Sequence, residues 1–131
     1  MRVLKVEGGI KKFERKITER SFQFAVRIVR LCQFLEKQDR VSRTLAFQLL
    51  RSGTSIGANI EEAQAGQSKA DFAAKMSIAH KEARETHYWL KLLIASEIVA
   101  EARLSELLQE ADELVRILTS IVKSAQTRNE S

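Results

Sequence analysis

Few side chains in this 131-residue chain have the type and spacing that metal binding or catalysis requires. His80 and His87 stand seven residues apart, which would place them on one face of a helix. A metal site in a helical bundle needs a Glu-x-x-His pair on each of two helices, and the sequence contains no such pair. We therefore expect no metal ligands, no catalytic residues and no cofactor.

The single cysteine, Cys32, falls in the apolar stripe of a predicted helix, and no histidine is positioned by the sequence to activate it. A cysteine in that setting behaves as a small hydrophobic residue, so we expect it in the core. One cysteine cannot form an intramolecular disulfide, which fits a reducing cytoplasm. The first residues lack the apolar core of a secretory signal, and no apolar run approaches the ~20 residues that span a bilayer. We expect a cytoplasmic protein with no membrane role.

A row of polar residues on the second predicted helix could do acid–base chemistry or could hold two helices in register. The row steps by four, four and three residues through Arg51, Ser55, Asn59 and Glu62, and Glu82 and Glu85 border the apolar stripe of the third predicted helix. Pairing of Arg51 with Glu85 or Glu62 would fix the helix register. A general acid and base would need a nucleophile or a cofactor site, which the sequence does not offer. The structural role is the favoured one.

Gly53 and Gly57 lie four residues apart inside the same predicted helix. They do not form a phosphate-binding loop, because such a loop lies between a strand and a helix. Their missing side chains would let another helix approach closely, so we expect both glycines at a helix contact.

A basic arc lies opposite the apolar half of the first predicted helix. It contains Gln23 and the four cations Arg20, Arg27, Arg30 and Lys37. Residues 1–51 carry 13 basic and 5 acidic side chains, whereas residues 52–131 carry 9 and 12, so the basic excess lies in the first part of the chain. Such a stripe could follow the phosphate backbone of RNA or DNA, and an oligomer would present it several times. The alternative is a solvated face with no ligand. We expect a separate acidic surface on the fourth predicted helix, at Glu106, Glu110 and Glu113.

Four amphipathic helices must position these side chains. Apolar residues recur at three- and four-residue steps over roughly 18–37, 42–65, 72–97 and 104–125, with Thr18 and Ser42 as the expected N-caps. The absence of proline and the low glycine content are typical of an all-α protein. Short loops between long helices make sequence neighbours antiparallel. The sequence predicts an all-α, antiparallel up-down-up-down four-helix bundle over residues 17–128, preceded by a flexible N-terminal arm over residues 1–16.

The first predicted helix carries more apolar surface than one core can use. Its apolar residues cover about half of the circumference, whereas a single core requires a stripe of about 100°. They are Phe22, Phe24, Ala25, Ile28, Val29, Leu31, Cys32 and Leu35. Phe24 and Leu31 lie at the outer edge of this surface, where a second copy of the chain would cover them. The alternative is a tilted bundle that buries both.

Four stretches of the chain resemble a family of bacterial proteins encoded in intervening sequences of 23S rRNA genes. They are KITERSFQFAVRIVRL, LLRSGTSIGANIEEA, SKADFAAKMSIAHKEARETHYWLKLL and ELVRILTSIVKSA. The likeness covers about residues 13–126. It implies a four-helix bundle that assembles into a ring-like homopentamer, with no established enzymatic activity and a proposed link to RNA. The chain is also similar to the accessory protein of diversity-generating retroelements, a basic pentameric bundle that works with a reverse transcriptase and nucleic acid.

The polar pattern of this family falls on the row described above, at Arg51, Ser55, Asn59, Glu62 and Glu85. Many relatives have proline where this chain has Gly57, and glycine followed by a Gly-Arg pair where this chain has Ala63. The resemblance therefore does not extend to a proline kink in the second helix or to an anion site on the loop that follows it.

These features lead to one leading hypothesis and two rivals. We expect a cytoplasmic, non-enzymatic homo-oligomer, most simply a pentamer, that binds RNA or DNA through basic surfaces, alone or with a protein partner. The first rival is a protein-interaction scaffold with no nucleic-acid role. The second, a hydrolase or metal enzyme, has only generic carboxylates in its favour.

Overall fold

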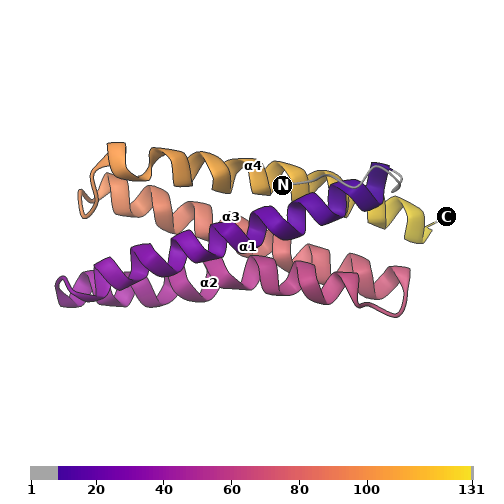
Figure 1. The fold of residues 1–131 in the computed structure, drawn as a ribbon, viewed down its shortest axis with the longest axis horizontal. Helices are drawn as coiled ribbons and strands as arrows, with labels where there is room; N and C mark the ends of the chain where they lie inside the picture. The colour runs from indigo at the N-terminus through magenta and orange to yellow at the C-terminus, as the bar shows by residue number, and fades with distance from the viewer. Residues whose placement is uncertain (1–8, 131) are drawn as a thin grey trace.

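A computed structural model describes residues 9–130 of the chain, and the side chains of residues 16–127. Four α-helices lie side by side along the length of the molecule (Figure 1). They are α1 (Gly9–Glu36), α2 (Arg40–Gln64), α3 (Lys69–Ala95) and α4 (Glu101–Glu130). The predicted all-α four-helix bundle is confirmed. None of these helices, over the residues described, is long and apolar enough to cross a membrane.

The first helix begins earlier than the sequence pattern predicted. It starts at Gly9 and continues through Thr18, so the predicted N-cap at Thr18 is wrong. Residues 9–16, predicted as part of a flexible arm, are helical. The buried stripe of α1 extends back to Ile17, and no proline interrupts the segment before it. Residues 1–8 of the predicted arm lie outside the described residues.

The second helix has a different N-cap from the predicted one. The side chain of Asp39 caps it by accepting a hydrogen bond of 2.8 Å from the backbone N–H of Ser42. This bond holds the pKa of the Asp39 carboxyl below its usual value. Ser42, predicted as the cap, is buried in the first turn instead. Both residue types are good caps, so their types alone did not decide between them.

The two glycines of α2 lie where α1 approaches closely. A Cβ atom on Gly53 would lie 2.8 Å from Cγ2 of Ile28, and one on Gly57 would lie 3.3 Å from Oγ of Ser21. Both distances are tighter than ordinary van der Waals contact. The expected helix contact at these glycines is present, and the order of its residues shows that α1 and α2 run antiparallel.

The heptad-like pattern of α4 predicts its buried face correctly. Every member of the predicted stripe is buried, namely Leu104, Leu107, Ala111, Leu114, Leu118, Ile121 and Ala125. These residues form one core with buried residues of the other three helices.

The buried face of α1 differs from the predicted one. Phe24 is 1% exposed and Phe22 is 59% exposed, so the prediction that Phe24 lies at the outer edge of the apolar surface is wrong. For Phe24 the alternative, a bundle that buries this side chain, is the observed arrangement. The row that faces the core contains the polar Ser21, whose hydroxyl donates to the Thr18 carbonyl oxygen over 3.0 Å. A small residue is needed there because Ser21 lies against Gly57. The core-facing row of α1 therefore includes a polar residue, and a prediction from hydrophobicity alone turned the core face of this helix away from that row.

The connection between α3 and α4 makes a tight turn. The third helix ends at Ala95, two residues before the predicted end, and Ser96 is its C-cap. Glu97 has a φ of 62°, in the left-handed region. After this turn Val99 enters the core.

The helix α1 crosses the bundle diagonally (Figure 1). Its N-terminal part lies beside α4, and its C-terminal part overlies α2. Among the helix pairs in contact, α1 and α4 touch least. The seam between α1 and α4 therefore opens toward the α1–α2 turn.

Candidate functional site

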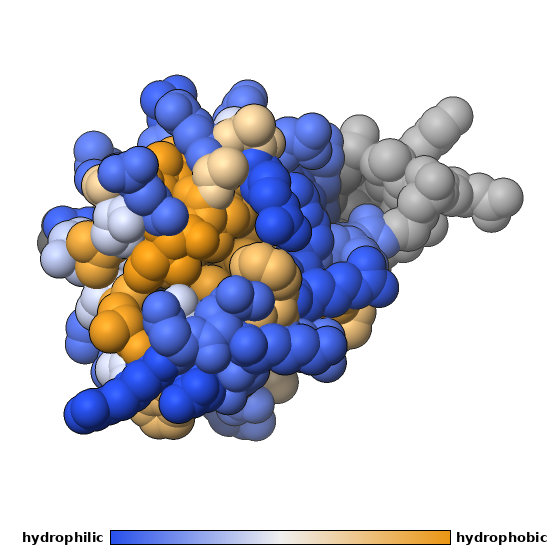
Figure 2. Space-filling model, turned by 90° about the vertical axis from the view of Figure 1, so that its left-hand side faces the viewer, coloured by the Kyte–Doolittle hydropathy of each residue, from blue (hydrophilic) through white to orange (hydrophobic). Residues whose placement is uncertain are grey.

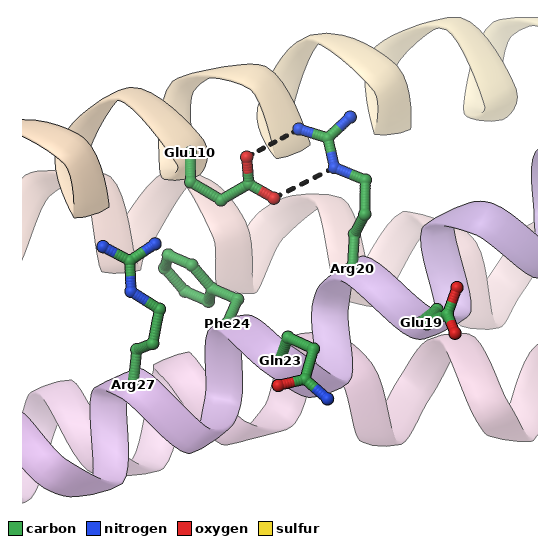
Figure 3. A pocket seen from close by; sticks show the side chains of 6 residues that line it. All are labelled: Glu19, Arg20, Gln23, Phe24, Arg27 and Glu110. Atoms are coloured by element: carbon green, nitrogen blue, oxygen red, sulfur yellow. Dashed lines mark hydrogen bonds and ion pairs between the residues drawn. The ribbon is translucent and has the colours of Figure 1, made fainter. Parts of the chain in front are cut away.

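Two shallow depressions lie along the seam between α1 and α4. The first is lined by Glu19, Arg20, Gln23, Phe24, Arg27 and Glu110 (Figure 3). The second lies closer to the α1–α2 turn and is lined by the cations Arg27, Arg30 and Arg103 and by the apolar Leu31, Phe34, Val99, Leu104 and Leu107. The seam thus holds three of the four cations predicted to bind nucleic acid, and we treat it as the candidate site.

At the narrow end of the seam, Arg20 is neutralised by α4. Its Nε and Nη2 atoms donate to the two carboxylate oxygens of Glu110 over 3.0 and 2.6 Å (Figure 3). Nη2 also donates to Glu113 over 2.8 Å. These bonds raise the pKa of Arg20 above its usual value and hold the pKa of the Glu113 carboxyl below its usual value. Arg20 is therefore held by carboxylates in the position where a phosphate was predicted to bind.

The predicted separation of a basic arc from an acidic surface is wrong at this seam. Arg27 also meets α4, with Nη2 4.0 Å from Oε1 of Glu106. The Glu106 side chain is 91% exposed, and so open a pair contributes little. Arg30 and Lys37 are exposed. The basic arc therefore divides into one arginine bound to α4 and three cations that remain accessible to solvent.

At the wide end of the seam, apolar side chains form a floor between the two helices. Leu31, predicted at an oligomer edge, is half-buried and packs with Phe34 against the core. The Arg103 guanidinium lies 4.7 Å from the centre of the Phe34 ring, a cation–π contact. Figure 2 views this end of the bundle and shows apolar surface in its middle with hydrophilic residues around it. The sequence pattern did not single out Arg103 or Phe34, because their contact depends on how α1 crosses α4.

The polar row of α2 contributes one cross-link to α3. Arg51 pairs with Glu85 and lies 3.5 Å from Glu82. The indole N–H of Trp89 donates to the same Glu85 carboxylate over 3.0 Å. The predicted Arg51–Glu85 contact is present, and it links two helices rather than facing the seam.

The other members of the polar row do not join this cross-link. The Ser55 hydroxyl donates to the Arg51 carbonyl oxygen over 2.7 Å, and the Asn59 amide donates to the Ser55 carbonyl oxygen over 2.8 Å. Glu62 is exposed near the end of α2. The Ser55 and Asn59 side chains satisfy their polar groups within α2, so the row does not act as one unit.

The two histidines lie between α3 and α4. His80 Nε2 is 2.8 Å from the Thr119 hydroxyl, and His87 Nε2 is 4.0 Å from the Asp112 carboxylate. The residue order of these contacts shows that α3 and α4 run antiparallel. Over the described residues, no group of three or more His, Cys, Asp or Glu side chains could hold a metal ion.

Cys32 lies in the core, as the sequence pattern predicted. Its thiol donates to the Ala46 carbonyl oxygen over 3.4 Å. Burial, with a smaller effect of the nearby Glu36 carboxylate, raises the pKa of the thiol to about 11. A thiol in this position is neutral near pH 7 and packs as an apolar group.

Comparisons with known proteins agree on one family. Residues 14–120 match the family described as 23S rRNA-intervening sequence protein. No curated protein sequence matches the chain. Among solved structures, the chain is similar to a protein of unknown function from the S23 ribosomal protein family of Bacteroides thetaiotaomicron VPI-5482. The two are 44% identical with a TM-score of 0.79, and the match covers 85% of this chain and 98% of the other. The resemblance found in the sequence is confirmed, and this chain belongs to the 23S rRNA-intervening sequence protein family.

Proposed function

We propose that this chain is a non-enzymatic, self-associating module of the cytoplasm that engages RNA through exposed cations beside the α1–α2 turn. The observation that carries the RNA proposal is the division of the basic arc. Arg20 is bound by α4, whereas Arg30, Lys37 and Arg40 are exposed around the turn. Exposed cations without a base-reading motif would bind phosphates with little regard to sequence.

The absence of an enzymatic role is proposed from how the reactive groups are held. Glu82 and Glu85, the carboxylates that could act as acid and base, are bound to Arg51. Cys32 is buried and its pKa is raised. A reduced, buried thiol also fits the proposed cytoplasmic setting.

Self-association is proposed from an apolar face on the outer side of the α1–α2 pair. Four large apolar side chains are exposed there, namely Phe22, Val29, Phe47 and Leu50. Val29 and Leu50 lie at one level, because Ile28 touches α2 at Gly53. Helix geometry turns both side chains to the side remote from α3 and α4. A second copy is the simplest cover for such a face, and five copies is the number that the family resemblance implies.

RNA binding can be tested by removing the exposed cations together. The variant Arg30→Gln/Lys37→Gln/Arg40→Gln is compared with the matched control Lys69→Gln/Lys81→Gln/Lys123→Gln, which loses the same charge at exposed sites on α3 and α4. Affinity for a 5′-labelled single-stranded RNA of about 20 nucleotides is measured by anisotropy over a salt series. Loss of three phosphate contacts should flatten the slope of log K against log salt by about 2. The control should keep the slope of the unmodified protein.

A protein-interaction scaffold with no nucleic-acid role is the second candidate. The same apolar outer face favours it, and so does the neutralisation of Arg20 by Glu110 and Glu113. Absence of measurable RNA affinity in the unmodified protein at about 50 mM salt, where electrostatic binding is strong, would overturn the RNA proposal and leave the scaffold.

A further inference from the structure

We propose that the wide end of the α1–α4 seam is a docking groove for a partner protein's amphipathic helix, one that carries acidic side chains beside its apolar face. This groove shares Arg30 with the cation cluster of Arg30, Lys37 and Arg40 but is otherwise a different surface, and the proposal does not depend on RNA binding. Its floor is apolar and its rim is formed by Arg27, Arg30 and Arg103.

The shape and chemistry of the floor fit a helix. Leu31 and Phe34 come from α1, and Leu104 and Leu107 come from α4, so apolar side chains from two neighbouring helices line one depression. A groove between two helices takes a third helix by receiving apolar side chains spaced three and four residues apart.

At the narrow end of the same seam, an arginine of α1 is already paired with acidic side chains of a neighbouring helix. There Arg20 is satisfied by two carboxylates of one helix, Glu110 and Glu113 of α4. Toward the α1–α2 turn α1 crosses away from α4, and only the loose contact to Glu106 remains at Arg27. Among the described residues, Arg30 has no ion pair. An acidic helix bound at the open end would pair its carboxylates with the α1 arginines there, as α4 does with Arg20 at the closed end.

An acidic helix fits this groove better than a single-stranded nucleic acid. Proteins bind such strands by combining a positively charged groove with aromatic rings on which successive bases stack. The groove has one aromatic residue, Phe34, and Arg103 already lies over its ring. The rest of its floor is aliphatic, which suits leucine or isoleucine side chains and offers no stacking surface.

The test uses three synthetic helical peptides of about 18 residues, long enough to hold a helix when capped and stapled. The first has leucines along one face with glutamates on both flanks. The second keeps the leucines and replaces each glutamate by lysine. The third keeps the glutamates and replaces each leucine by glutamine. The first should bind the full chain with at least roughly tenfold higher affinity than the other two in about 50 mM salt, because only it supplies both charge and apolar contact.

The variant Arg27→Glu/Arg103→Glu reverses the rim without touching Arg30, Lys37 or Arg40. It should lose affinity for the glutamate peptide and gain affinity for the lysine peptide, each by roughly tenfold or more. The control Lys81→Glu/Lys123→Glu changes the net charge equally at exposed sites outside the groove and should alter neither affinity. Circular dichroism checks that both variants remain helical.

Three results would overturn the proposal. One is equal binding of the glutamate and lysine peptides to the unmodified protein. Another is unchanged peptide binding in the rim variant. The third is a rim variant that changes the oligomeric mass in light scattering while no peptide binds the unmodified protein, because a second copy would then occupy the groove. RNA affinity is measured separately with the variant Lys37→Gln/Arg40→Gln, which leaves the rim residues Arg27, Arg30 and Arg103 in place. Failure of one proposal therefore does not decide the other.

Discussion

Arg20 on α1 and Glu110 on α4 are 90 residues apart in the sequence and form a two-point contact, with N–O distances of 3.0 and 2.6 Å. The guanidinium of Arg20 therefore links α1 to α4, and these two helices have the smallest contact of all neighbouring helix pairs. A bidentate arginine–carboxylate pair is stronger than an ordinary exposed ion pair, because two parallel bonds fix its geometry. The contact therefore holds the narrow end of the seam closed.

We expect Arg20 and Glu110 to show a coupling free energy of about 1 kcal/mol in a double-mutant cycle. Arg20→Gln and Glu110→Gln should each lower the free energy of unfolding, and the double variant should lose less than the sum. Urea unfolding at one protein concentration measures all four proteins. Arg27 and Glu106, 4.0 Å apart and more exposed, provide a control cycle that should give almost no coupling. Additive losses at Arg20 and Glu110 would mean that the contact does not stabilise the seam.

Gly53→Ala should lower the unfolding free energy, although alanine is the better helix former. The added methyl group would lie 2.8 Å from Ile28, and such overpacking costs about 1–3 kcal/mol against a propensity gain of about 1 kcal/mol. Gly57→Ala is the matched control, because its Cβ would lie 3.3 Å from the Ser21 hydroxyl and the contact needs to relax by only a few tenths of an ångström. Thermal unfolding should rank Gly53→Ala below Gly57→Ala. A higher melting temperature for Gly53→Ala than for the unmodified chain would contradict the close contact.

A comparison of the buried face of α1 with that of α4 shows which parts of the fold a periodic sequence pattern can predict. In α4 a single apolar stripe exists, and all seven of its predicted core positions are buried. In α1 apolar residues surround half of the helix, so the pattern permits more than one core face. The choice of Phe24 over Phe22 follows from Ser21 against Gly57, a contact between helices that one-helix periodicity does not contain.

The same reasoning applies to the candidate site. Arg20, Arg27 and Arg30 were identified from their shared arc on one helix, but pairing with α4 depends on the crossing of two helices. Arg103 was missed because it precedes the first buried leucine of α4 and gains its role only beside Phe34. The Arg51–Glu85 contact was predictable because α2 and α3 are sequence neighbours joined by a short loop.

The unfolding free energy should fall as the pH drops from about 7.5 to about 5.5. Burial lowers the pKa values of both His80 and His87 below 6.5, with further lowering by Arg84 at His80 and by Lys91 at His87, where Asp112 acts in the opposite direction. Because the unfolded chain protonates its histidines first, their contribution is present above about 6.5 and is lost as the pH falls through the lower folded values. Urea unfolding across this window tests the expectation. The variant His80→Gln/His87→Gln should lose most of the pH dependence of the unfolding free energy. If this variant keeps the dependence of the unmodified protein, groups other than the two histidines cause it.

Phe22→Glu/Phe47→Glu should dissociate the proposed assembly into folded single chains. Phe22 and Phe47 are 59% and 63% exposed, so a charge at either position costs little within one chain but a great deal in an apolar interface. The first control is Phe24→Glu, which places a charge in the core and should unfold the chain, since Phe24 is 1% exposed. The second is Tyr88→Glu, at an exposed site on α3 away from the α1–α2 face, which should leave the assembly intact.

Light scattering at micromolar concentration gives the mass, and circular dichroism separates dissociation from unfolding. A mass near 14.9 kDa for the unmodified protein would contradict self-association. The exposure of Phe22 and Phe47 on one face would then have no explanation in an interface between copies of the chain. A mass that persists in the Phe22 and Phe47 variant would instead place the interface elsewhere on the bundle.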